Sequence, residues 1–155
     1  MATPDTPSRK PLSMTLVGTW ELLTREDYTH GGERRIDPGL GANPIALIFF
    51  DAKGNFAAQF MKRDRRSETG ADPVKTPPNN SRARGGYDAY FGTYTVDDVA
   101  GTVTTRQVGA LSPENVGQLF VRAMSVEGDN LTIRLETARP DGEPILRTLR
   151  WKRVG

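Results

Sequence analysis

The dominant pattern in this chain is an alternation of apolar and polar residues with a period of two. This alternation is typical of half-buried β-strands, because successive side chains of a strand point to opposite faces. Turn-forming residues interrupt it, for example at 51–54 (DAKG), 127–130 (EGDN) and 140–142 (PDG). The expected strands are residues 16–23, 45–50, 55–61, 87–96, 101–108, 117–126, 131–137 and 145–154.

Eight consecutive strands joined mostly by short turns predict an all-β fold. We expect an eight-stranded up-and-down antiparallel barrel, because closure of the sheet removes the exposed edges that an open sheet would leave. A β-sandwich is the alternative arrangement. No segment keeps a helical apolar stripe, so a helix is expected only as a short one, near 11–15 or within 112–116. A barrel of this size either fills its interior with side chains or holds one small ligand.

The domain organisation follows from length and from two irregular segments. A chain of 155 residues has the size of a single domain, and we expect the barrel to span 12–155. Residues 1–11, which include three prolines, are expected to form a disordered tail. A long basic loop is expected at 62–86, with seven Lys and Arg residues against three acidic ones. Such a loop is either a solvated segment or a lid that attracts an acidic ligand.

The composition removes several classes of chemistry. The chain has no cysteine and a single histidine, His30, so disulfides, thiolate metal centres, cysteine nucleophiles and most imidazole metal sites are excluded. His30 lies in a polar, glycine-rich segment, where a solvated side chain is expected. The phosphate loop, the nucleophile elbow and the dinucleotide fingerprint are also missing from the sequence. We therefore expect neither a metal nor a cofactor.

Charge and hydropathy limit the partners. The net charge of +2 is too small to argue for a polyanion, and no nucleic acid partner is expected. The rings of the 87–94 segment (YDAYFGTY) would suit base stacking, but the period of two turns half of them inward. No apolar run approaches the ~20 residues of a membrane span, and no secretory signal opens the chain. We expect a cytoplasmic protein, either a monomer or a homodimer.

Polar residues on inward faces are the most informative candidates for a site, because an unpaired polar atom in an apolar cavity is costly. In the 117–126 segment, Arg122 shares a face with Gln118, Phe120 and Met124. An inward arginine can hold a carboxylate, phenolate or enolate through two parallel hydrogen bonds. The alternative is that Arg122 points to solvent or pairs with an internal glutamate such as Glu21 or Glu136.

Several strands mix large rings with small residues, which leaves room for a compact apolar ligand. We expect a pocket bounded by Phe60, Tyr94, Phe120 and Met124, with Gln59 and the tyrosines as hydrogen-bonding groups. The full set of candidate ligand-binding residues is Arg122, Gln59, Tyr94, Tyr90, Phe60, Phe120, Met124 and Gln118.

Several separated sequence blocks within residues 12–154 resemble those of one protein family and occur in the same order. They are LVGTWEL, LGANPIALIFFDAKGNFAAQFMKRDR, AYFGTYTVDDVAGTV, LSPENVG, VEGDNLTIRLE and LRWKR. The chain is similar to the bacterial lipocalin-like domain proteins, small barrels that mostly lack an assigned activity. The resemblance implies that Trp20 lies at the barrel floor and packs against a late arginine, Arg153 or Arg150. Family members often carry histidine where this chain reads TTRQV at 104–108, and this departure argues against histidine acid–base catalysis.

Three functions fit these observations. The first is binding of a small hydrophobic molecule with a polar or acidic end inside the barrel, oriented by Arg122, Gln59 or Tyr94. The alternative is a cofactor-independent isomerase, cyclase or lyase that acts on a hydrophobic metabolite in the same cavity. The third is an interaction domain with a filled barrel, in which the 62–86 loop recruits a partner.

Overall fold

The computed structural model of the chain describes residues 10–65 and 85–155. The tail predicted for 1–11 lies outside the described residues except for Lys10 and Pro11. The greater part of the predicted basic loop, 66–84, lies outside them as well.

The described residues form strands with two short helices. The helices are α1 (Leu12–Thr15) and a 3-10 turn, η2 (Pro113–Asn115), which confirms both expected helical segments. The strands are β1 (Gly18–Tyr28), β2 (Arg34–Arg35), β3 (Ile45–Phe50), β4 (Asn55–Met61), β5 (Tyr87–Asp97), β6 (Thr102–Ala110), β7 (Leu119–Glu127), β8 (Asn130–Ala138) and β9 (Pro144–Arg153).

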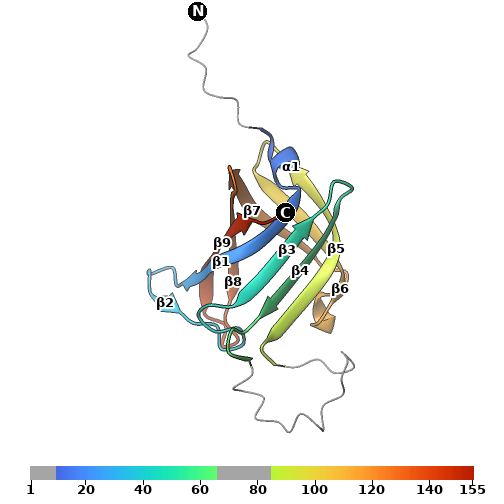
Figure 1. The fold of residues 1–155 in the computed structure, drawn as a ribbon. Helices are drawn as coiled ribbons and strands as arrows, with labels where there is room; N and C mark the ends of the chain where they lie inside the picture. Colours follow the sequence, from blue (N-terminus) through green and yellow to red (C-terminus); the bar gives the residue numbers. More distant parts are fainter. Residues whose placement is uncertain (1–9, 66–84) are drawn as a thin grey trace, which may run out of the picture.

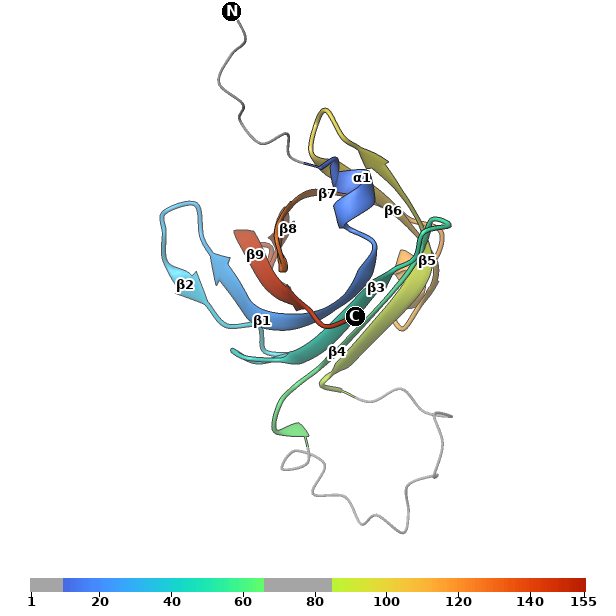
Figure 2. The same cartoon turned by 45° about the horizontal axis from the view of Figure 1, so that its top comes forward.

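The strands close into an eight-stranded antiparallel barrel, as predicted (Figure 1). From β3 to β9 each strand pairs with the next along the chain, and β1 pairs with both β3 and β9. The alternative of a sandwich is therefore wrong. The two-residue strand β2 was not predicted. It pairs with the C-terminal end of β1, through Asp27↔Arg35 and Tyr28↔Arg34. Figure 2 shows the strands curving into a ring around the barrel interior.

The period of two in the sequence corresponds to side chains that point alternately into the barrel and towards the solvent. In β4, Phe56, Ala58 and Phe60 are buried, whereas Asn55 and Gln59 on the other face are exposed. The same alternation runs through β6 and β8, so the core is built from one face of each strand. Burial of these apolar faces provides the main stabilisation of the fold.

One end of the barrel is closed around Trp20, which lies near the start of β1 and is fully buried. The indole Nε1 of Trp20 donates a hydrogen bond to the Leu16 carbonyl at 3.0 Å. The guanidinium of Arg153 stacks over the Trp20 ring at 4.2 Å from its centroid, which confirms the predicted pairing and selects Arg153 over Arg150. Gly18 allows this close approach, because a Cβ there would lie 2.6 Å from Nη1 of Arg153. Helix α1 and the C-terminus lie together at this end.

Helix α1 is fixed to the closed end by polar contacts and by its apolar neighbours. The Ser13 backbone N–H and hydroxyl donate to the two carboxylate oxygens of Asp98, at 2.8 and 2.7 Å. Asp98 lies in the turn between β5 and β6, so the helix is tied to the far side of the barrel. Leu16, directly after the helix, is fully buried in the core. We refer to the opposite end, at which β1, β4, β6 and β8 finish, as the mouth.

Candidate functional site

The barrel encloses a cavity of about 120 Å³. Apolar cavities of ~150 Å³ in protein interiors bind benzene, so this volume suits one compact ring or a short chain. Phe60, Phe120 and Met124 of the four residues expected to bound a pocket line this space, whereas Tyr94 does not. Its lining residues are Arg25, Leu40, Ile48, Phe50, Phe56, Phe60, Asp88, Tyr90, Thr105, Gln107, Phe120, Arg122, Met124, Ile133, Leu135, Arg147, Leu149 and Trp151.

Aromatic rings form much of the apolar wall. Phe60 contacts Trp151 edge-on, with ring centroids 5.8 Å apart, and Tyr90 at 6.2 Å. Phe56 lies 6.0 Å from Tyr90 and 6.3 Å from Phe50. Such rings bury a large apolar area and hold a planar or aliphatic ligand without a directional bond.

The polar part of the lining comes from the strand segments near the mouth. Arg25 lies towards the end of β1, Asp88 near the start of β5, and Arg147 near the start of β9. Arg122 lies in the first half of β7 and Gln107 near the end of β6. The cavity is consequently amphipathic, with charged and amide groups towards the mouth.

Two of the three lining arginines are held by carboxylates. Arg147 donates two parallel hydrogen bonds to Asp27, at 2.7 and 3.0 Å, and Asp27 is buried. Arg25 donates to Asp37 at 2.9 Å, and Arg147 lies 3.7 Å from the same carboxylate oxygen. Burial by itself would raise the pKa of Asp37, but Arg25 and two backbone N–H groups hold it below the ordinary value. These pairs tie the 36–41 loop to β1 and β9.

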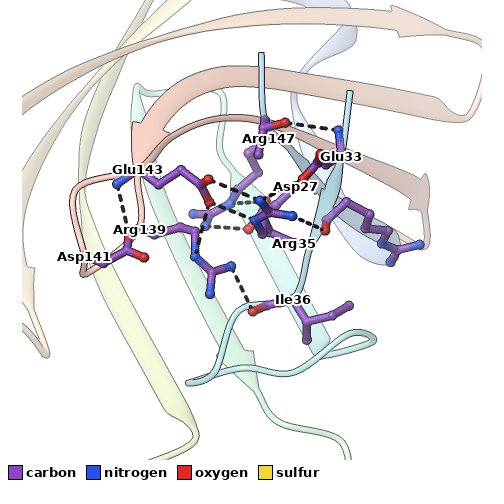
Figure 3. A network of polar contacts seen from close by, with 10 residues as sticks. Asp27, Glu33, Arg35, Ile36, Arg139, Asp141, Glu143 and Arg147 are labelled. Carbon is purple, nitrogen blue, oxygen red and sulfur yellow. Dashed lines mark hydrogen bonds and ion pairs between the residues drawn. The ribbon is translucent and has the colours of Figure 1, made fainter. Parts of the chain in front are cut away.

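Further ion pairs extend this cluster outward from the barrel (Figure 3). Arg35 of β2 donates to both carboxylate oxygens of Glu143, at 2.8 and 3.2 Å, and to Glu33 at 3.0 Å. Arg139 lies 3.8 Å from Glu143 and donates to the carbonyl of Ile36 at 3.4 Å. This outer part is more exposed, and it holds the β1–β2 and β8–β9 connections together.

Arg122 differs from the other lining arginines. Its guanidinium stacks on the Phe120 ring, 4.9 Å from the centroid, and donates one long hydrogen bond of 3.4 Å to the Val121 carbonyl. No carboxylate of residues 10–65 or 85–155 lies within ion-pair distance of it, and neither Glu21 nor Glu136 is its partner. Burial lowers the pKa of Arg122, and the charge of Arg147 acts in the same direction. The cavity wall therefore contains a cation without a counter-ion from the described chain.

Asp88 and Tyr90 add a carboxyl group and a phenol to the cavity lining. Burial raises the pKa of Asp88 above its ordinary value, and its charge interaction with Arg25 offsets only part of this. Burial, together with the nearby Asp88 carboxylate, raises the pKa of Tyr90 to about 12. Tyr90 is thus a neutral hydroxyl at physiological pH. Within the described residues no ion pair involves Asp88.

Two buried polar atoms in the lining have no hydrogen-bond partner among the described residues: the side-chain oxygen Oε1 of Gln107 and the indole nitrogen Nε1 of Trp151. Gln107 is 6% exposed and Trp151 is 1% exposed. Leaving a buried polar atom unpaired costs roughly 1–3 kcal/mol, so such atoms in a cavity wall are natural contact points for a bound molecule.

Five of the candidate residues come together in the cavity: Phe60, Tyr90, Phe120, Arg122 and Met124. The other three lie elsewhere. The Tyr94 hydroxyl donates to the Asp51 carbonyl, and its ring packs edge-on against Phe50 at 5.0 Å. Gln59 and Gln118 are both exposed.

The positions of Gln59 and Gln118 follow from strand geometry. Gln59 precedes the buried Phe60, and consecutive residues of one strand cannot both face the interior. Gln118 precedes β7, which begins only at Leu119, so the alternation of that strand does not extend to it.

The candidate set lacked eight polar or aromatic residues of the lining: Arg25, Phe50, Phe56, Asp88, Thr105, Gln107, Arg147 and Trp151. Thr105 and Gln107 could have been predicted from the sequence, because they follow Val103 at alternate positions of one predicted strand. Arg25 lies beyond the end of the predicted first strand, which extends to Tyr28 in the structure.

Other kinds of site find little support in the described part of the chain. His30 is exposed in the turn that follows β1. Across residues 10–65 and 85–155, no cluster of three His, Cys, Asp or Glu side chains is arranged to hold a metal ion. No helix in these segments is long and apolar enough to cross a membrane.

Comparison with known proteins agrees with the architecture. A sequence profile described as the lipocalin-like domain matches residues 17–154, which include every strand of the barrel. A search of curated proteins finds no match. The match covers most of the chain and confirms the resemblance drawn from the sequence blocks. The chain belongs to the lipocalin-like domain family.

Proposed function

We propose that the barrel binds a small, largely apolar molecule that carries one anionic group. The apolar part packs against Phe56, Phe60 and Trp151, and the anionic group contacts Arg122. The observation that carries this proposal is the contrast among the lining arginines: Arg25 and Arg147 are paired with aspartates, whereas Arg122 stacks on Phe120 without a carboxylate from the described residues. A bound anion would supply the missing counter-charge.

The proposal is tested with a series of phenylalkanoates, from benzoate to 5-phenylpentanoate, and the corresponding primary amides. Arg122→Met is expected to weaken binding of the carboxylates by about tenfold or more, since a hydrogen bond to a charged group contributes ~1.5–3 kcal/mol. Binding of the amides is expected to change little. The matched control is Arg106→Met, an arginine on the exposed face of β6.

Titration calorimetry gives both affinities for each variant. Equal losses for acids and amides in Arg122→Met would contradict an anion contact at this residue. If wild-type protein binds none of the series, and native mass spectrometry of freshly purified protein finds no retained acid, the binding proposal itself is wrong.

A second candidate function, cofactor-independent isomerisation, cyclisation or elimination, is favoured by Asp88. This carboxyl lines the same cavity as Arg122, and burial raises its pKa, which makes its carboxylate a stronger base. Asp88 would accept a proton from carbon, and Arg122 would stabilise the resulting oxyanion. Under this proposal Asp88→Asn abolishes turnover of a substrate while its binding persists. Turnover that survives the substitution would exclude Asp88 as the base.

A further inference from the structure

Strands β7 and β8 separate on the mouth side of the barrel. Their ladder runs from Glu127↔Asn130 to Ala123↔Arg134 and stops there. Both strands nevertheless continue. Residues 119–122 of β7 remain paired with β6, and residues 135–138 of β8 remain paired with β9. Continuation of the ladder would have paired Arg122 with Leu135, so the barrel wall has a gap at the level of Arg122.

A groove of about 650 Å³ lies over this gap. Its lining includes the outward-facing residues Val121 and Glu136 together with Arg122, Leu135 and Arg147. These last three also line the central cavity. The groove and the cavity are therefore separated at this level only by side chains, without a hydrogen-bonded backbone between them.

The groove carries positive charge from β7 and β8. Arg122 and Arg134 line it, and in the described part of the chain neither has a carboxylate within ion-pair distance. Arg147 also lines the groove, but it is bound to Asp27. Glu136 is the acidic residue of the lining. The combination of two available guanidinium groups and one carboxylate favours an anion.

The seam between β9 and β1, two seams round the barrel from β7–β8, has no comparable opening. There β1 pairs with β9 from Trp20↔Arg153 to Tyr28↔Leu146, with one register shift. The buried pair of Asp27 with Arg147 lies across this same seam. The β1–β9 ladder thus continues to the mouth, whereas the β7–β8 ladder ends at Ala123↔Arg134.

From this geometry we infer that the ligand passes through the wall between β7 and β8 and that its anionic group remains in the groove, between Arg122 and Arg134. The inference rests on the proposed binding function. It specifies the ligand class as an elongated amphiphile with a terminal carboxylate or similar anion. The apolar part extends past Leu135 into the cavity, and the anion stays outside the apolar core, where its desolvation cost is lower.

The route is tested by blocking the gap chemically. Because the chain contains no cysteine, a single introduced thiol is labelled selectively. Val121→Cys places the thiol on the groove, at a position that is 58% exposed. Ser125→Cys is the matched control, since it lies on the same strand and the same exposed face, but inside the intact ladder opposite Thr132. Both are modified with the same bulky maleimide.

Stopped-flow tryptophan fluorescence with 5-phenylpentanoate measures association and dissociation. Label at Val121→Cys is expected to slow both rates by about tenfold or more, because the bulky group obstructs the gap through which the ligand would enter and leave the cavity. Label at Ser125→Cys is expected to leave both rates near those of wild type. Circular dichroism of each labelled protein establishes that the barrel is intact.

Arg134→Met provides a second, independent test of the lateral route. It is expected to weaken binding of 5-phenylpentanoate severalfold while leaving benzoate, which is too short to span cavity and groove, nearly unchanged. If wild-type protein binds these acids but neither the label at Val121→Cys nor Arg134→Met has an effect, the lateral route is wrong and the proposed binding function stands. Absence of binding in wild-type protein would instead remove the proposed function.

Discussion

The closed end of the barrel and the central cavity each contain an arginine stacked on an aromatic ring, but the two guanidinium groups differ in their hydrogen bonds. At the closed end, Arg153 stacks on Trp20, and its guanidinium also donates to the carbonyls of Val17 at 2.8 Å and Thr15 at 2.6 Å. In the cavity, Arg122 stacks on Phe120 but makes a single long bond to its neighbour Val121. One arginine has its donors occupied by the chain, and the other has most of them available.

The two tryptophans repeat this contrast. The Nε1 of Trp20 is bonded to the Leu16 carbonyl, whereas the Nε1 of Trp151 has no partner among the described residues. Both rings are almost completely buried. A buried polar group that is left unpaired by the chain is available to contact a bound molecule. The comparison thus separates structural residues from candidate binding residues of identical chemical type.

The largest expected difference is in the stability lost when each arginine is replaced. Arg153→Met is expected to lower the free energy of unfolding by about 2–4 kcal/mol, because two part-buried carbonyls lose their donor and the stacking on Trp20 is lost. Arg122→Met is expected to change it by less than about 0.5 kcal/mol or to raise it, since a half-buried charge without a carboxylate partner among the described residues is removed. Urea denaturation of both variants measures the difference. Comparable destabilisation by the two substitutions would show that Arg122 is structural.

A smaller effect is expected from Asp88, and it depends on pH. The folded state raises the pKa of Asp88, so the folded protein binds this proton more tightly than the unfolded chain. The Asp88 contribution to stability is therefore fully present at pH below the ordinary aspartate value and is lost as pH rises through the higher folded value. Arg25, Asp37 and Tyr90 are the charged or titratable groups that influence it.

Asp88→Asn is expected to be more stable than wild type near neutral pH and to lose this advantage below about pH 4, where the aspartate of both states is protonated. Thermal unfolding at a series of pH values measures the difference between the two proteins. A constant difference across the acidic range would mean that Asp88 titrates normally.

The smallest expected effect comes from Gln107. Gln107→Met keeps the approximate volume and removes a buried oxygen that has no partner, so stability is expected to be unchanged or raised by up to roughly 1 kcal/mol. Gln59→Met, at an exposed position of β4, is the control for the same replacement on the outer face. Urea denaturation compares both with wild type. A clear loss of stability in Gln107→Met alone would show that the Oε1 of Gln107 is satisfied in solution.

Much of the architecture was predictable because it depends on local patterns. The alternation of apolar residues located all eight barrel strands, and it placed Phe120, Arg122 and Met124 on the inward face of β7. The resemblance to lipocalin-like proteins placed Trp20 against a late arginine. The same rule, applied strictly, would have excluded Gln59, because its neighbour Phe60 faces the interior.

The polar part of the cavity was not predictable in the same way. Arg25, Asp88, Gln107 and Arg147 belong to β1, β5, β6 and β9, and no short sequence window contains two strands that meet across the cavity. Whether each arginine is paired depends on contacts such as Arg147 with Asp27, which are separated by 120 residues. A pattern of single positions carries no information about such pairs.

The sequence by itself determined the strands, their inward faces and the closed barrel, because a period of two and the turns between strands are local properties of the chain. The tertiary structure alone decided which charges are neutralised, which polar atoms remain unpaired and where the wall opens. Both β7 and β8 keep their alternation past Ala123 and Arg134, yet their ladder ends there. The register and separation of neighbouring strands are set by how the whole barrel closes, and for this reason the gap beside Arg122 appears only in the folded protein.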